Sequence, residues 1–132
     1  MGLGAPMPFV IQKTKKMRIA LILLIGIHGI IHLFGFFKAF GISQFNMISQ
    51  PISKILGVIW LFAFLLLVST SVLLKAQSNF CWIIGILGVL LSQFSIINFW
   101  IDAKFGTILN LVILTSIIIA YSRFSFAKKG DV

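Results

Sequence analysis

Four long apolar runs, separated by short polar breaks, dominate the pattern of hydrophobic and polar positions along the chain. The runs cover residues 17–37, 54–74, 80–101 and 106–121. An α-helix rises about 1.5 Å per residue, so roughly 20 apolar residues are enough to cross the hydrocarbon core of a bilayer. The pattern therefore predicts four transmembrane helices.

The breaks between these runs are short and contain residues that end helices. They lie at residues 41–51, 75–79 and 102–104. The first begins with a glycine and ends with a proline, and the second contains glutamine, serine and asparagine. Because such short connections leave no room for a crossover, we expect consecutive helices to run antiparallel.

The predicted fold class is all-α, an integral membrane up-and-down four-helix bundle. This bundle fills residues 17–122 and leaves two basic tails, residues 1–16 and 123–132. The composition supports this prediction, since 60% of the residues are hydrophobic and only 10% are charged. A soluble domain of this length has too much surface to carry so few charges.

The basic residues are divided unevenly between the two ends of the predicted bundle. Only Lys38, Lys54 and Lys104 fall at the end away from the termini. The end that carries both termini has eight: Lys13, Lys15, Lys16, Arg18, Lys75, Arg123, Lys128 and Lys129. The positive-inside rule places both termini in the cytoplasm, as expected for a multi-pass protein of a bacterial inner membrane. Contact with anionic lipids then accounts for the net charge of +9, without a nucleic-acid partner.

Polar side chains inside the apolar runs gather towards the outer end of the predicted bundle. His28 and His32 are one turn apart, about 40° on a helical wheel. Along the third run and at the first residue after it, small and polar residues lie within about 140° of one another: Gly85, Gly88, Ser92, Ser95, Asn98 and Asp102. Small residues let helices approach closely in lipid, so we expect this stripe to face the bundle interior. Gln93 points away from the stripe, towards a different neighbour.

The sequence therefore predicts an outward-opening polar pocket. The candidate lining residues are His28, His32, Ser95, Asn98, Asp102 and Asn110. Lys38 and Lys104 are expected at its rim.

Three interpretations of the two histidines remain open. Polar groups at membrane depth are costly unless satisfied, so the imidazoles either hydrogen-bond across helices or form a binding site. The third interpretation is contact with another protein. A binding site would take a proton, a metal or a quinone-like molecule.

The ligand classes fit the pocket unequally. Bis-histidine haem needs ligands on opposite faces of the ring, whereas His28 and His32 share one helix face. A metal ion would have too few ligands, since Asp102 is the one carboxylate expected near the two histidines. No metal site is therefore predicted. A quinone-like or other small apolar molecule needs only a few polar groups in an apolar cleft. His32 would then be its proton donor.

The segment HGIIHLFG, which follows Arg18, resembles the first helix of the DoxX-like family of small bacterial membrane proteins. That family often reads H-G-x-x-K-L there, so His28, Gly29 and Leu33 match, and His32 stands where lysine is usual. The segments QPIS…LGVIWLF and LSQFSIINFWIDAKFGTILN resemble a related group of bacterial membrane domains. The resemblance implies a four-helix bundle, sometimes found as an oxidoreductase or quinone-reducing subunit.

Two functions follow as hypotheses, and whether the protein is an enzyme stays open, with no catalytic residue assigned. The first is a DoxX-like inner-membrane protein, a redox-associated accessory subunit that binds a quinone or other small apolar ligand. The alternative is a non-catalytic structural or assembly subunit, which docks onto a larger membrane complex through the apolar face of residues 54–74.

Overall fold

The computed structural model describes the backbone of residues 9–42 and 47–130, and side chains within residues 15–42, 47–119 and 121. The regular secondary structure of this part of the chain is entirely helical, without strands, so the all-α prediction is confirmed for it. Its elements are α1 (Phe9–Ala39), α2 (Lys54–Lys75), α3 (Cys81–Asn98), α4 (Trp100–Ala103) and α5 (Gly106–Gly130).

Three helices of the described chain are long and apolar enough to cross a membrane. They are Lys15–Ala39 within α1, Lys54–Lys75 and Cys81–Asn98. The apolar part of α5, Gly106–Ile119, is shorter. These lengths and compositions support a multi-pass membrane protein.

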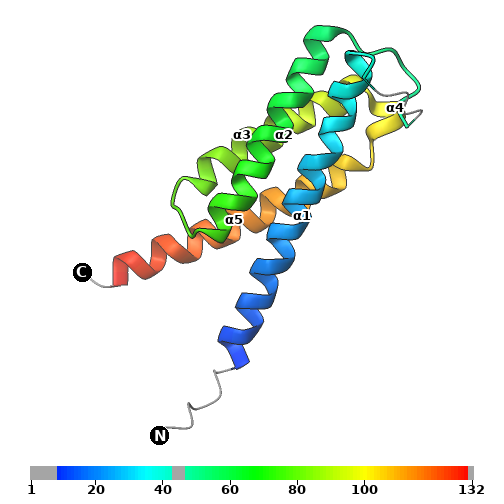
Figure 1. Ribbon diagram of the computed structural model, residues 1–132. Helices are drawn as coiled ribbons and strands as arrows, with labels where there is room; N and C mark the ends of the chain where they lie inside the picture. The colour runs from blue at the N-terminus through cyan, green and yellow to red at the C-terminus, as the bar shows by residue number, and fades with distance from the viewer. Residues whose placement is uncertain (1–8, 43–46, 131–132) are drawn as a thin grey trace, which may run out of the picture.

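The four long helices pack in chain order, α1 against α2, α2 against α3, and α3 against α5 (Figure 1). The first turns of α1 and the last turns of α5 lie at one end of the molecule, and α4 lies at the other. α1 begins at Phe9 and α5 continues to Gly130, so both helices extend into the segments expected as tails.

Specific residues end α1 and start α2. Gly41 has a φ of +67°, a left-handed conformation that costs glycine little. The backbone N–H of Ile42 returns to the Phe37 carbonyl at 2.9 Å, which closes the helix end. Ser53 caps the start of α2, where its hydroxyl accepts a hydrogen bond from the Leu56 N–H at 3.3 Å.

The third apolar run does not form one helix to residue 101. α3 ends at Asn98, and Phe99 has φ −122° and ψ 39°, outside the helical region. The Phe99 side chain is buried against Ile48, Ile52 and Trp60, with its ring 5.8 Å from the indole of Trp60. The break thus accompanies burial of an aromatic ring, and α4 follows it as a separate turn.

Gly35 lets α1 pack directly onto the indole of Trp60 in α2. A Cβ atom placed on Gly35 would overlap the ring carbons of Trp60. The indole is buried and contacts both His32 and Phe99, so its movement away from α1 would disturb both of these ring contacts. Gly35 therefore sets the distance between α1 and α2 beside the histidines.

We expect Gly35→Ala to destabilise the protein by about 1–3 kcal/mol, because the added methyl group overpacks the α1–α2 contact. Thermal unfolding in detergent, followed by circular dichroism, measures the effect. Gly26→Ala on the same helix is the matched control, since its nearest neighbour would be the Ser71 hydroxyl at 3.3 Å. Equal unfolding temperatures for the two variants would contradict the prediction.

Candidate functional site

α1 places His28 and His32 on the face that it turns towards the other helices. Their side chains are 3% and 2% exposed. The two imidazole rings are edge to face, with centroids 5.1 Å apart. Because the residues are four apart in a helix, they lie one above the other on one face.

The hydroxyl of Ser92, in α3, holds both imidazoles. Its oxygen lies 2.7 Å from Nε2 of His32 and 3.2 Å from Nε2 of His28. The same oxygen lies 3.0 Å from Oδ1 of Asn110, in α5. Ser92 itself is fully buried, so one hydroxyl connects three helices inside the bundle.

The hydrogen-bond network continues from Asn110 across α3 and α5. Oδ1 of Asn110 lies 2.9 Å from Nε2 of His28, and its Nδ2 donates to Oε1 of Gln93 at 3.1 Å. Nε2 of Gln93 donates to the hydroxyl of Thr107, also at 3.1 Å. The network fixes the Nε2 side of both histidines through residues of neighbouring helices.

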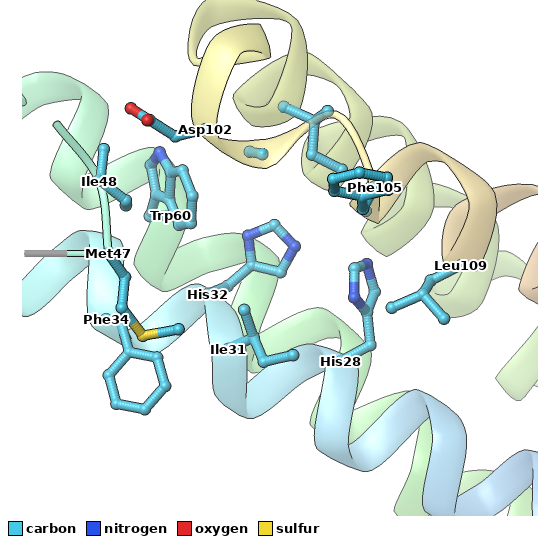
Figure 2. A pocket seen from close by; sticks show the side chains of 13 residues that line it. His28, Ile31, His32, Phe34, Met47, Ile48, Trp60, Asp102, Phe105 and Leu109 are labelled. Carbon is cyan, nitrogen blue, oxygen red and sulfur yellow. The ribbon is translucent and has the colours of Figure 1, made fainter. Parts of the chain in front are cut away.

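The opposite side of each imidazole has no partner in the part of the chain that the structure describes. Nδ1 of His28, Nδ1 of His32 and Nε1 of Trp60 are all buried without a hydrogen bond. Trp60 is 3% exposed, and its indole lies 5.0 Å from the imidazole of His32. Figure 2 shows the three rings in a row, with His32 between His28 and Trp60.

These three residues line one pocket of about 250 Å³. The rest of its lining is mainly apolar: Ile31, Phe34, Met47, Ile48, Ile96, Asp102, Ala103, Phe105, Gly106 and Leu109. Met47 and Phe105 are each 70% exposed and form the open side, whereas the histidines and the indole form the buried side. The pocket is therefore an apolar cleft with a few polar nitrogen atoms deep inside.

Asp102 lies at the edge of this pocket and ties α4 to the segment before α2. Its carboxylate accepts hydrogen bonds from the Ser49 N–H at 2.9 Å and the Ser49 hydroxyl at 2.9 and 3.0 Å. The Ser49 hydroxyl is the largest cause of a lowered Asp102 pKa, helped by the backbone amides of Ser49 and Gln50 and by Lys38. A carboxyl with a lowered pKa stays ionised, so this tether is present at neutral pH and is lost only as pH falls below about 4.

The structure brings together some of the residues that the sequence nominates. His28, His32 and Asn110 share the network, and Asp102 lines the same pocket as both histidines. Lys38 lies near enough to Asp102 to affect its pKa, as a rim residue would. The Nζ atom of Lys104 lies 5.6 Å from the ring centre of the pocket residue Phe105.

Two nominated residues bond within their own helix. The buried hydroxyl of Ser95 donates to the Leu91 carbonyl at 3.0 Å. Asn98 is exposed, and its side-chain amide donates to the Phe94 carbonyl at 2.8 Å. Neither residue lines the pocket.

Several residues of the site are absent from the nominated set. Ser92 belongs to the small-residue stripe on the third run, but no feature of the sequence distinguishes it from Ser95 or Asn98 as a site residue. Gln93 bonds Thr107 and Asn110 of α5, and Asn110 is also the partner of the stripe residue Ser92, so the expectation that Gln93 reaches a different neighbour is wrong. Trp60 carried no sequence signal, because an indole in an apolar run is ordinary.

The described residues include no group of three or more His, Cys, Asp or Glu side chains placed to hold a metal ion. No protein-family model, characterised protein or solved structure matches the chain. Inference about function therefore rests on the pocket itself.

We expect Ser92→Ala to lower the free energy of unfolding by about 1 kcal/mol, because it removes the shared partner of two buried imidazoles. Ser95→Ala is the matched control: the same change in the same helix, at a hydroxyl that bonds only its own backbone. Reversible unfolding in mixed detergent micelles measures both. A Ser95 variant that is as destabilised as the Ser92 variant would contradict this role of Ser92.

Proposed function

We propose that this chain is a small multi-pass membrane protein that binds a quinone-like or similar small, largely apolar molecule in the pocket lined by His28, His32 and Trp60. The observation that carries the proposal is the set of three buried ring nitrogens, unpartnered within the described chain, in one pocket. Buried polar atoms without partners are rare and costly, and a ligand that carries hydrogen-bonding groups on a small ring would supply partners for them.

The size and lining of the pocket favour one ring with substituents. A cavity of about 150 Å³ is enough to hold benzene, and this pocket has about 250 Å³. Its walls are mostly aliphatic and aromatic, with few polar atoms, which is the usual composition of a small-molecule site. Imidazoles beside a bound quinone could also exchange protons with it.

The membrane and the partner are further parts of the proposal. The basic residues gather at the end that carries both termini, which supports an inner-membrane protein with cytoplasmic termini and a pocket that opens outward. The resemblance of HGIIHLFG to the first helix of DoxX-like proteins supports a role as a redox-associated accessory subunit. That resemblance covers residues 18–110, which include all residues of the pocket.

Quinone binding is expected to quench Trp60, because a quinone in the pocket would contact the indole. The test uses a short-chain 1,4-benzoquinone and the Trp82→Phe, Trp100→Phe variant, in which Trp60 is the sole tryptophan. We expect saturable quenching. The matched control, Trp60→Phe with Trp100→Phe, keeps Trp82, which packs against Tyr121 outside the pocket lining.

Tryptophan octyl ester in the same micelles measures the quenching caused by quinone dissolved in detergent. If the Trp60 protein is quenched no more than this reference, the pocket does not bind quinones. A structural or assembly role, with packing histidines, would then be favoured.

The proposed orientation is tested by cysteine labelling in spheroplasts, in a Cys81→Ala background. We expect Ile42→Cys, between α1 and α2, to react with a membrane-impermeant maleimide from outside. Asn79→Cys, between α2 and α3, should react only after the membrane is permeabilised. Both wild-type side chains are exposed in the protein. A difference in labelling would therefore report the side of the membrane on which each cysteine lies. The reverse pattern would overturn the proposed topology.

A further inference from the structure

The hydrogen-bond network determines which nitrogen of His28 carries hydrogen. The Nδ2 group of Asn110 donates to Gln93 at 3.1 Å, so Oδ1 of Asn110 is the atom that faces His28, at 2.9 Å from Nε2. Nε2 of Gln93 donates in turn to the hydroxyl oxygen of Thr107, at 3.1 Å. A carbonyl oxygen can only accept, so Nε2 of His28 must be the donor.

The other nitrogen of His28 is therefore a bare acceptor. A neutral imidazole carries one N–H, and burial without a paired anion favours the neutral ring. The nearest carboxylate in the pocket, Asp102, is already bonded to Ser49. Nδ1 of His28 thus offers a lone pair without any partner among the described residues. The same reasoning applies to His32, because the Ser92 hydroxyl donates its single hydrogen to Oδ1 of Asn110 and therefore accepts from Nε2 of His32.

Trp60 offers the opposite polarity at the other end of the row. Its indole N–H can only donate. The ring centroids of His28 and His32 are 5.1 Å apart, and those of His32 and Trp60 are 5.0 Å apart, so the ring with the bare acceptor and the ring with the donor lie on either side of His32 (Figure 2). A 1,4-substituted six-membered ring carries one oxygen at each end, so it offers one hydrogen-bonding group to each of these two rings.

We infer that the pocket selects its ligand in the hydroxyl-bearing form, a hydroquinone or related phenol, whose O–H donates to Nδ1 of His28 while its other oxygen accepts from Nε1 of Trp60. This inference rests on the proposed function and specifies the ligand's hydrogen-bonding polarity. A quinone has two acceptors, so it can satisfy Trp60 but leaves His28 facing a carbonyl oxygen. The oxidised form is bound more weakly for this reason.

A series of three ligands tests the inference on the unchanged protein. The ligands are a short-chain 1,4-benzoquinone, its hydroquinone kept reduced under anaerobic conditions, and the dimethyl ether of that hydroquinone. Their dissociation constants are measured by isothermal titration calorimetry in one detergent. The hydroquinone should bind about tenfold or more tightly than either other ligand, because only it donates a hydrogen bond.

Two variants, each with phenylalanine as the replacement, show which residue causes the preference for the hydroquinone. His28→Phe keeps a planar ring but removes the acceptor, so the three ligands should bind within about threefold of one another. Trp60→Phe removes the donor, so it should weaken all three ligands and leave the preference for the hydroquinone in place. If His28→Phe does not fold, the three dissociation constants measured on the unchanged protein still test the preference for the hydroquinone.

The outcomes separate this inference from the proposed function. If the quinone binds as tightly as the hydroquinone, or more tightly, the inference is overturned and a quinone-like site remains. If the ether matches the hydroquinone, ring shape governs binding and the inference is again overturned. If none of the three binds, the proposed function falls together with the inference.

Discussion

The contact on which the site depends is that between the Ser92 hydroxyl and the two imidazoles of α1. In a lipid environment no solvent is available to satisfy buried polar groups, so each must find a partner within the bundle. One fully buried hydroxyl meets Nε2 of His28, Nε2 of His32 and the amide oxygen of Asn110. It therefore sets the relation of α1 to α3 and α5 at the depth of the pocket.

The polarity of the pocket follows from this arrangement. The network uses the Nε2 atoms of both histidines, so their buried Nδ1 atoms have no hydrogen-bond partner among the described residues. Gly35 brings the indole of Trp60 onto α1, which adds an N–H donor beside the two imidazoles. A few hydrogen-bonding atoms in apolar walls give orientation and specificity to a small ligand, while the apolar area supplies affinity.

The open side of the pocket combines two kinds of surface. Phe105 and Met47 expose large apolar side chains, which suit lipid or the hydrophobic part of a ligand. Asp102, held by Ser49 and close enough to Lys38 for their charges to interact, provides a polar edge at the same end of the bundle. A molecule with an apolar body and polar oxygens is compatible with both surfaces. Inorganic ions, by contrast, would gain little from the aliphatic walls.

The sequence by itself determined the helical class and three helices long and apolar enough to cross a membrane, because hydropathy and helix rise act locally along the chain. It also identified His28, His32, Asn110 and Asp102 as polar residues that need an explanation at membrane depth. Only the tertiary structure decided that Ser92, rather than the neighbouring polar residues of its stripe, is the shared partner, and that Trp60 belongs to the site. The reason is physical: these choices depend on which side chains of different helices lie within hydrogen-bonding or packing distance. The small-residue stripe indicated the face of α3 but not the depth or angle at which α1 and α5 meet it.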